Sequence, residues 1–448
     1  MAPRWNSPRL LAALLALGLI ATSCGSSTDA DTDVADAPAT TAASSPATTA
    51  ATTTQAPPET EPGSTEAEDD EPADADPVDA RAALIEEITA VLVEWQEGGG
   101  IPAASLSVRL PGQEAIEIAI GITDITTGQE ATTNDFYRIG SITKPMTAAI
   151  VLQLVDEGLI ELDEPVQTYI PGWLAGHQYA SEITIRQLMN HTNGLIEYAL
   201  SPVFFALAGT RLEQPYDPAE IVEWLARQPP LFPPGEQYSY ETGGFLTLGT
   251  VIELVTGNSA AAEMRARIFE PAGAENIYLT PEEFPPTPTI NGYGRAEMYL
   301  AGTILVGRAD EAKLTIENES VVDVSGLPQE GLQSAGWTGG GNEARLESVS
   351  AVMKAMFDGT ILTDEQIDVM TEPTLDVTYG LGIDDQVIDG VRVLSHGGGV
   401  PGFRSQGNYL PELDLSWAVS VNLVPLPEGS TVGDLRRALL PVLVAAVE

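Results

Sequence analysis

The chain of 448 residues carries a formal net charge of −45 at pH 7, from 65 acidic and 20 basic residues, and −33 of this charge lies in residues 81–448. A surface so rich in acid repels nucleic acid and anionic lipid headgroups, and neither is expected to bind the folded part directly. The single cysteine excludes an intramolecular disulfide framework.

The N-terminal segment has the pattern of an export signal: Arg4 and Arg9 precede an apolar run over residues 10–20, and three small residues lead to Cys24. The run is too short for a transmembrane helix, which takes about 20 residues. The position of Cys24 resembles the lipidation site of bacterial lipoproteins, where acyl chains anchor the mature protein. The sequence therefore predicts a signal peptide over residues 1–24 and a lipid anchor on the outer face of the cytoplasmic membrane. The alternative is an ordinary cleaved signal, with secretion.

The next segment, residues 25–79, consists mainly of Thr, Ala, Pro, Ser, Asp and Glu. It cannot bury enough apolar surface to offset the entropy of ordering, so it is predicted to be a disordered acidic linker. Residues 80–448 show a continuous pattern of apolar segments and are predicted to form one folded domain.

Two strands and three helices are predicted in the first part of this domain. Apolar residues at helical spacing and turn residues at the boundaries indicate helices over Ala80–Trp95, from about Gly140 to Gly158 and over Ile185–Asn190, with strands over Ala103–Leu110 and Ala115–Ile120. The strands flank Pro111-Gly112-Gln113, which predicts a hairpin. Thr184 and Gln187 form a capping box for the third helix.

The second part is predicted to continue with helices and to end with strands. Helices are expected over Tyr216–Arg227, Phe245–Val255, Leu346–Phe357, Thr363–Met370 and Gly433–Val447, a proline-rich loop over Glu282–Pro288, and strands over Arg404–Leu410 and Leu415–Leu423. Strands at both ends, with helical material between them, predict an α/β fold. Its antiparallel sheet would be built from both ends of the chain, flanked by helices and interrupted by a mostly helical region.

The strongest chemical signal is Ser141 followed by Lys144, three residues later. On a helix this spacing puts both side chains on one face, and a serine hydroxyl needs such a neighbouring base before it acts as a nucleophile. A helix start also favours the developing negative charge of the serine oxygen. Burial would favour the neutral form of the lysine, which a base must adopt. Pro145 removes a backbone hydrogen bond and predicts a tight or kinked first turn.

The surrounding segment, Phe136–Lys144, closely resembles the active-site segment of the serine β-lactamase and penicillin-binding protein family, in the branch of class C β-lactamases, D,D-carboxypeptidases and related esterases. Four further segments resemble this branch in the same order: Leu154–Ile170; Ile183–Leu195, with the sequence His-Thr-Asn-Gly-Leu at its end; Pro234–Gly249, with Tyr-Glu-Thr for Tyr-x-Asn; and His396–Phe403, for the Lys-Thr-Gly strand motif. The likeness covers residues 80–448, apart from a poorly matching stretch between Glu282 and Ser334.

The resemblance implies a role for each matching residue. Tyr240 would share with Lys144 the transfer of the Ser141 proton to the leaving group. His396 would bind a substrate carboxylate or hydrogen-bond to Tyr240. The backbone N–H groups of Ser141 and Gly399 would form the oxyanion hole. Gly397, Gly398 and Thr242 would contact the substrate.

One position departs from the family pattern, because Thr242 stands where the family has asparagine. A threonine hydroxyl can donate one hydrogen bond but does not offer the separate donor and acceptor of an amide. This places in doubt the recognition of a β-lactam or peptide amide. The neighbouring Glu241 is predicted to be a surface carboxylate.

The other candidate residues and motifs do not indicate a catalytic or metal site. His191 is predicted to be structural, at a helix end, and His177 a loop residue. The histidines lack metal-ligand spacing, so no metal or other cofactor is expected. A Gly-x-Ser-x-Gly elbow is absent, which argues against an α/β-hydrolase.

The sequence therefore predicts a serine hydrolase that acts through a Ser141 acyl-enzyme and resembles a D,D-carboxypeptidase or an esterase. Its expected substrate is a cell-wall peptide, a β-lactam or a small ester, and its other partner a membrane, through the lipid anchor. Two alternatives stay open: a true class C-like β-lactamase, and a non-catalytic wall-binding module that retains the fold.

Overall fold

The computed structural model describes residues 77–201, 214–295, 313–316, 319–325, 330–427 and 429–447. The predicted signal peptide, Cys24 and nearly all of the predicted linker lie outside these residues. The first described element is helix α2 (Pro77–Gly98), which begins inside the segment predicted as linker. The helix thus starts two residues before the predicted linker boundary at residue 79, and Pro77 is well suited to the first turn of a helix.

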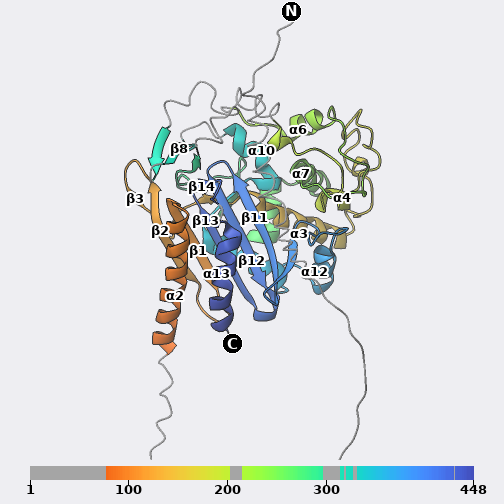
Figure 1. Cartoon of the computed structure of the whole chain (residues 1–448). Coiled ribbons are helices and arrows are strands. Elements are labelled where there is room, and N and C mark those ends of the chain that lie inside the picture. Colours follow the sequence, from red (N-terminus) through yellow and green to blue (C-terminus); the bar gives the residue numbers. More distant parts are fainter. Residues whose placement is uncertain are drawn as a thin grey trace, which may run out of the picture. The chain divides into compact units, whose positions relative to one another are not determined.

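The main sheet has seven strands and joins the two ends of the chain. Its strands are β1 (Ala103–Arg109), β2 (Ile116–Asp124), β3 (Gln129–Glu130), β10 (Asp384–Ile388), β11 (Val391–Val400), β12 (Phe403–Leu410) and β13 (Leu415–Val421), in the order β10-β11-β12-β13-β1-β2-β3. Every pairing is antiparallel, and the register Ala104↔Val421 ties the first strand to the last. The predicted α/β fold, with an antiparallel sheet built from both ends, is confirmed (Figure 1).

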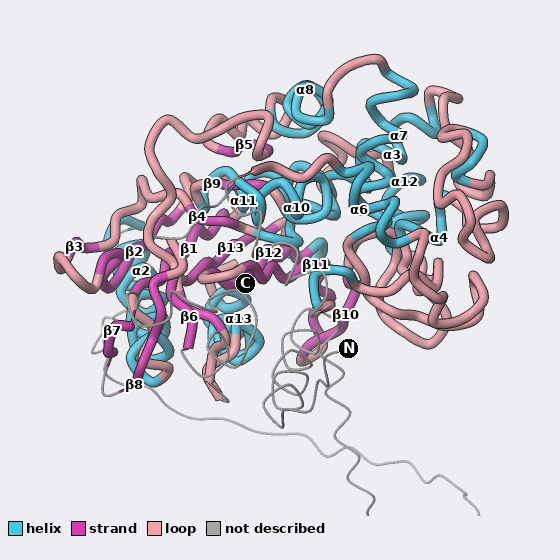
Figure 2. The backbone as a smooth tube through the Cα atoms, turned by 90° about the horizontal axis from the view of Figure 1, so that it is seen from above, coloured by secondary structure: helices cyan, strands magenta, loops and turns pink. Residues whose placement is uncertain are grey.

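Helices cover both faces of this sheet. On one face lie α2 and the last helix, α13 (Val432–Ala445), and on the other lies α11 (Leu346–Phe357), as Figure 2 shows. Leu92 of α2, Trp417 of β13 and Leu439 of α13 are all buried in one apolar cluster. The Trp95 indole donates a hydrogen bond to the Thr431 carbonyl oxygen (3.0 Å), which fixes the end of α2 against the start of α13.

The inserted region is mostly helical, as predicted. It contains α3 (Thr143–Asp156), α4 (Ile185–Met189), α6 (Pro218–Leu225), α7 (Gly243–Thr256), α8 (Ala260–Met264), α10 (Glu330–Gly340) and α12 (Asp364–Thr371). Tight 3₁₀ turns lie at Gly140–Ile142, Val166–Thr168, Tyr198–Leu200 and Pro411–Leu413, and a π-helical turn at Arg265–Phe269. Helix α3 is buried on nearly all sides, which makes it a rigid base for side chains on its first turn.

Two smaller sheets flank the main one. The first pairs β4 (Tyr137–Arg138) and β5 (Ile277–Leu279) with β9 (Asn342–Ala344), in the order β4-β9-β5. The second contains β14 (Leu423–Val424), β6 (Tyr293–Arg295), β8 (Glu319–Asp323) and β7 (Lys313–Ile316). Strand β4 ends just before Ser141, so its pairing with β9 fixes the direction from which the chain enters the candidate site.

Local signals in the sequence located several boundaries correctly. The predicted capping box Thr184/Gln187 is formed, the helix Leu346–Phe357 has its predicted bounds, and residues 282–288 form a loop. A second capping box, Thr363/Gln366, starts α12. Among the described residues, no single helix has the length and hydropathy of a membrane span, although the bent pair Gly243–Thr256 and Ala260–Phe269 passes that test together.

Candidate active site

Ser141 lies in a tight turn, between strand β4 and helix α3. The turn is a 3₁₀ helix over Gly140–Ile142, so the tight start expected from Pro145 is present, although Ser141 precedes the α-helix. Gly140 has a φ of +54°, which favours glycine. The Thr143 hydroxyl donates to the Gly140 carbonyl oxygen (2.8 Å) and stabilises the turn. Ser141 is buried, with 8% of the residue exposed.

Lys144 is fully buried one turn later and touches Ser141. Its Nζ donates to Ser141 Oγ (3.1 Å), to the Gly339 carbonyl oxygen (2.7 Å) and to Thr242 Oγ1 (3.4 Å). The same nitrogen lies 4.8 Å from the centre of the Tyr240 ring. The structure therefore brings together three predicted residues, Ser141, Lys144 and Tyr240, from separate segments of the chain.

Strand β11 passes very close to the segment that carries Ser141, and glycines allow this approach. A Cβ on Gly398 would lie 1.9 Å from the Ile139 carbonyl oxygen, and a Cβ on Gly140 would lie 2.8 Å from the Gly399 nitrogen. The Ser405 hydroxyl donates to the same Ile139 oxygen (2.8 Å) and bridges the two segments. The Gly399 N–H and the Ser141 turn are thus neighbours, as the predicted oxyanion hole requires, and this role stays a prediction.

His396 is buried on β11, and its two ring nitrogens are hydrogen-bonded to the protein. Nε2 lies 3.0 Å from the hydroxyl of Tyr379, and Nδ1 lies 2.7 Å from the Gly397 carbonyl oxygen. The hydrogen bond expected between His396 and Tyr240 is not among these contacts, although the two rings are neighbours with centroids 6.2 Å apart. Tyr379 takes that place, and no sequence signal pointed to it.

The Tyr379 hydroxyl also contacts His191, which links the two histidines in one chain of hydrogen bonds. The Glu241 N–H donates to His191 Nδ1 (3.3 Å), so the proton of the neutral ring is on Nε2, which donates to Tyr379 (3.2 Å). Tyr379 then donates to His396 Nε2, and His396 Nδ1 donates to Gly397. Each of these groups therefore acts as donor or acceptor in one consistent way, which defines the tautomers of His191 and His396.

The electrostatics agree with two neutral imidazoles. Burial and the nearby Lys144 ammonium lower the pKa of His396 to about 3. The same two causes hold the pKa of His191 well below its ordinary value. His396 therefore offers no positive charge to a substrate carboxylate at neutral pH. His191 lies just after α4, and it was predicted to be a structural residue at a helix end. The hydrogen bonds through Tyr379 also link it to His396.

Two carboxylates lie near Lys144, and one corrects a prediction. Glu241, predicted to be a surface residue, is fully buried and accepts hydrogen bonds from Asn193 Nδ2 (2.9 Å) and the Gly244 N–H (2.8 Å). The sequence pattern did not show this because the burial comes from packing against a distant segment. Burial raises the pKa of Glu241 to about 7.

The second carboxylate, Glu197, was not predicted at all. It accepts a hydrogen bond from the Thr242 hydroxyl (2.9 Å) and another from the Ala199 N–H (2.8 Å). Its position two residues after the His-Thr-Asn-Gly-Leu segment was the only available signal. Thr242, predicted to contact the substrate, has its hydroxyl between Lys144 and Glu197, where one oxygen both accepts and donates.

Two further residues from the sequence analysis, Gly397 and His177, lie on strand β11 and in a loop, respectively. Gly397 follows His396 on β11, and a Cβ there would lie 3.6 Å from Nη2 of Arg404. His177 is a buried loop residue, as predicted.

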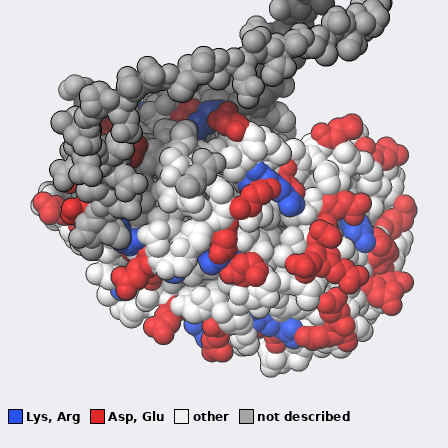
Figure 3. Space-filling view, turned by 90° about the horizontal axis from the view of Figure 1, so that it is seen from below, with Lys and Arg blue, Asp and Glu red and all other residues white. Residues whose placement is uncertain are grey.

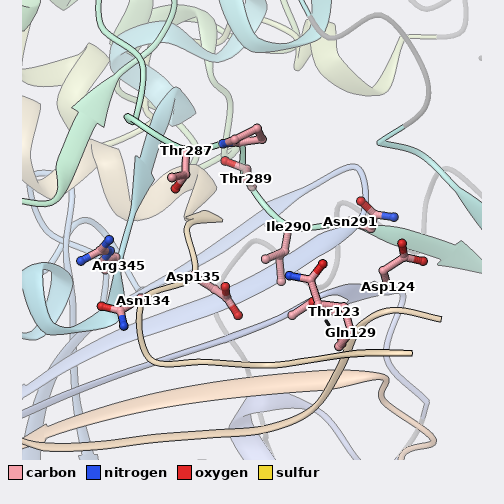
Figure 4. Close-up of a pocket in the computed structure, with 11 residues that line it drawn as sticks. Thr123, Asp124, Gln129, Asn134, Asp135, Thr287, Thr289, Ile290, Asn291 and Arg345 are labelled. Atoms are coloured by element: carbon pink, nitrogen blue, oxygen red, sulfur yellow. Dashed lines mark hydrogen bonds between the residues drawn. The ribbon is translucent and has the colours of Figure 1, made fainter. Parts of the chain in front are cut away.

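Figure 4 shows a separate polar hollow of about 470 Å³ with Arg345 and Asn134 at one side and Asn291 and Asp124 at the other. None of its eleven lining residues belongs to the group around Ser141.

The fold and the site define a class of protein: a mixed α/β protein whose Ser-x-x-Lys turn faces a glycine-rich strand. A family model described as "Beta-lactamase" matches residues 81–440. The chain belongs to the beta-lactamase family, and the predicted class of enzyme, a β-lactamase-related serine hydrolase, is confirmed at the level of this family.

Named relatives cover several activities within this family. Penicillin-binding protein 4 of Amycolatopsis lactamdurans is 33% identical over 41% of this chain and 46% of its own length. Esterase EstB of Burkholderia gladioli is 30% identical over 45% of this chain and 54% of its own length. Each match thus spans about half of the relative. Among solved structures, a D-stereospecific amidohydrolase from Streptomyces sp. is 27% identical, with a TM-score of 0.64 over 79% of this chain and 97% of that one.

Proposed function

We propose that this protein hydrolyses an ester or amide bond through an acyl intermediate on Ser141. The observation that carries the proposal is the contact of 3.1 Å between Ser141 Oγ and Lys144 Nζ, because an activated nucleophile needs a base within hydrogen-bond reach. The full burial of Lys144 among Tyr240, Phe245 and the Gly339 carbonyl adds support, since it holds the amine in one position.

In the proposed acylation step, neutral Lys144 takes the hydroxyl proton while Ser141 Oγ bonds to the substrate carbonyl carbon. The carbonyl electron pair moves onto the oxygen, which would accept hydrogen bonds from the N–H groups of Ser141 and Gly399. The intermediate collapses, the bond to the leaving group breaks, and Lys144 with Tyr240 returns the proton to that group. Water then attacks the acyl-enzyme in the same manner and restores Ser141.

The site favours small esters and amides over β-lactams. His396 is neutral, and the two carboxylates Glu197 and Glu241 lie near Lys144, so none of these three groups attracts a substrate carboxylate. A cation, Arg404, lies beside Gly397 on the neighbouring strand β12. Thr242 has its hydroxyl engaged within the protein and does not replace the amide of the family asparagine. The esterase and the D-stereospecific amidohydrolase among the similar proteins support the same substrate class.

A comparison of substrates tests this proposal. Hydrolysis rates of the full chain on p-nitrophenyl acetate, a D-alanine amide, a D-Ala-D-Ala peptide and nitrocefin are expected to fall in that order. Ser141→Ala should abolish all of them. Fastest turnover of nitrocefin would support the class C-like β-lactamase instead. No turnover of any substrate, by a protein shown to be folded, would support the non-catalytic wall-binding module.

We also propose that the protein is exported and held on the outer face of the cytoplasmic membrane by acyl chains on Cys24. The apolar run 10–20, with Arg4 and Arg9 before it and small residues after it, supports this proposal. In that location a wall peptide or a small ester in the surrounding medium would be within reach of the enzyme.

A further inference from the structure

We propose that the polar hollow of Figure 4 is a second binding site, separate from the Ser141 group, and that it takes a short zwitterionic peptide. The carboxylate of the peptide would bind to Arg345, and its ammonium group to Asp124. No residue that lines the hollow takes part in the proposed acyl transfer, so this inference goes beyond that function.

The hollow is built from four segments that are distant in the sequence. It is lined by the hairpin of β2 and β3, by the turn before β4, by residues 287–291 and by Arg345, which directly precedes α11. The Ile290 N–H donates to the Phe136 carbonyl oxygen (3.2 Å) and joins two of these segments. The volume, about 470 Å³, is that of a site for a small ligand.

Arg345 gives the hollow a cation that the protein does not use for an ion pair of its own. Its guanidinium carbon lies 4.8 Å from the centre of the Phe136 ring, and this stacking holds the side chain in place. Its Nε has no hydrogen-bond partner among the residues that the structure describes, and none of their carboxylates pairs with the guanidinium. Acidic residues outnumber basic ones by 65 to 20, so a shortage of acids does not explain this. A stacked guanidinium is well suited to binding a carboxylate.

The opposite side of the hollow carries the complementary charge. Figure 4 shows Asp124 there, beside Asn291, with Asp135 drawn between the two sides. The Thr126 N–H donates to Asp124 Oδ1 (2.8 Å), and the Thr132 N–H donates to Asp135 Oδ2 (2.7 Å). These backbone contacts hold both carboxylates in position, so that the first can bind an ammonium group and the second can accept a peptide N–H.

The charges favour a ligand that carries both signs. Two carboxylates and one guanidinium line the hollow, and the chain around them is strongly acidic, so a simple anion is repelled. A zwitterion is neutral overall and offers one group to each side. The peptide bonds between its ends would meet Asn134 and Gln129, whose side chains make no hydrogen bond to the described part of the chain.

The extent of the hollow favours a peptide over a single amino acid. Residues 287–291 run along it from the side of Arg345 to the side of Asp124 (Figure 4). An amino acid carries both charges on one carbon atom and would meet only one side. A peptide of three residues extends over roughly 10 Å and can place its two termini at opposite sides.

Isothermal titration calorimetry with triglycine tests the proposal. The full chain with Ser141→Ala is used, so that the peptide stays intact. We expect triglycine to bind. Triglycine amide, which lacks the carboxylate, and N-acetyltriglycine, which lacks the ammonium group, should each bind at least about tenfold more weakly, because each loses a charge-assisted hydrogen bond. Equal affinity for triglycine and its amide, or no binding of triglycine at millimolar concentration, would overturn the proposal.

Variants in the same background locate the bound peptide. Arg345→Gln should weaken triglycine about tenfold and leave the weak binding of triglycine amide unchanged, because the amide has no carboxylate for Arg345. Asp124→Asn should do the same for triglycine and N-acetyltriglycine, and it decides alone if Arg345→Gln does not fold. Arg227→Gln removes the same charge from an exposed ion pair with Glu223 and serves as the control. Equal binding of triglycine by Arg345→Gln and this control would overturn the proposal.

Labelling of the wild-type chain by a fluorophosphonate separates the two sites. Saturating triglycine should leave the rate of labelling at Ser141 unchanged. A rate suppressed by triglycine would place the peptide in the candidate active site and overturn the inference. Absence of labelling in the folded wild type would contradict the acyl-transfer function alone, because the calorimetry decides the hollow without it.

Discussion

At the scale of single residues, the site depends on side chains whose hydrogen-bonding roles are defined by their neighbours. Tyr379 is the clearest case, because its hydroxyl lies 3.2 Å from His191 Nε2 and 3.0 Å from His396 Nε2. Both rings are buried and neutral. Loss of the hydroxyl would leave a buried donor on one ring and a buried acceptor on the other without their partner.

Tyr379→Phe is therefore expected to reduce the free energy of unfolding by about 1–3 kcal/mol. Urea denaturation followed by circular dichroism measures this change. Tyr238→Phe is the matched control, because the neighbouring Tyr238 hydroxyl is buried but has no hydrogen-bond partner among the described residues. Equal stability losses in the two variants would contradict the proposed chain of hydrogen bonds.

The buried residues that the sequence did not reveal share a physical cause. Glutamate and tyrosine side chains are common on surfaces, yet contacts between distant segments bury Glu241 and Tyr379 and partly bury Glu197. Ser141 and Lys144 could be predicted because their spacing is local and one helical turn brings them together. The partner of His396 could not be predicted, since it lies in a loop that carries no family motif.

At the scale of elements, boundaries with local signals were predictable and short strands were not. The capping boxes at Thr184 and Thr363 define helix starts by contacts within four residues. Strands β4 and β9 have only two and three residues and exist because they pair across the chain. Their pairing gives Ser141 its place, although neither strand has an alternating pattern of its own.

The close approach of β11 to the serine turn makes Gly398 sensitive to substitution. Gly398→Ala is expected to destabilise the fold by about 1–3 kcal/mol and to slow fluorophosphonate labelling, because its Cβ would lie 1.9 Å from the Ile139 carbonyl oxygen. Thermal unfolding and labelling rates measure the two effects. Gly397→Ala is the control for stability, since its Cβ meets no atom closer than 3.6 Å. A Gly398→Ala protein as stable as this control would contradict the geometry.

At the scale of the whole molecule, acidic side chains dominate the charged surface. On the face in Figure 3, acidic residues form several groups and basic residues are fewer and scattered. With a net charge of −45 for the chain, mutual repulsion opposes the compact state. At 0.1 M salt, the repulsion between exposed charges more than about 10 Å apart is largely screened.

The melting temperature is therefore expected to rise as sodium chloride is added to a low-salt buffer, and to level off once the surface charges are screened. Differential scanning calorimetry at several salt concentrations gives this dependence. A melting temperature that is constant or falls over the same range would show that ion pairs outweigh the repulsion.

The attachment of the whole protein to a membrane depends on Cys24. Cys24→Ser is expected to move the expressed protein from the membrane fraction to the soluble fraction, because a serine cannot carry the thioether-linked lipid. Fractionation of cells followed by immunoblotting measures the distribution. Retention of the variant in the membrane fraction would count against lipidation at this residue.

If the protein acts as proposed, Ser141 Oγ is the atom that becomes acylated. Mass spectrometry of peptides from the full chain after reaction with a fluorophosphonate tests this most directly. The result we predict is a single adduct on the peptide that contains Ser141, lost in Ser141→Ala and strongly reduced in Lys144→Met. An adduct on a different serine, or an undiminished adduct in Lys144→Met, would contradict it.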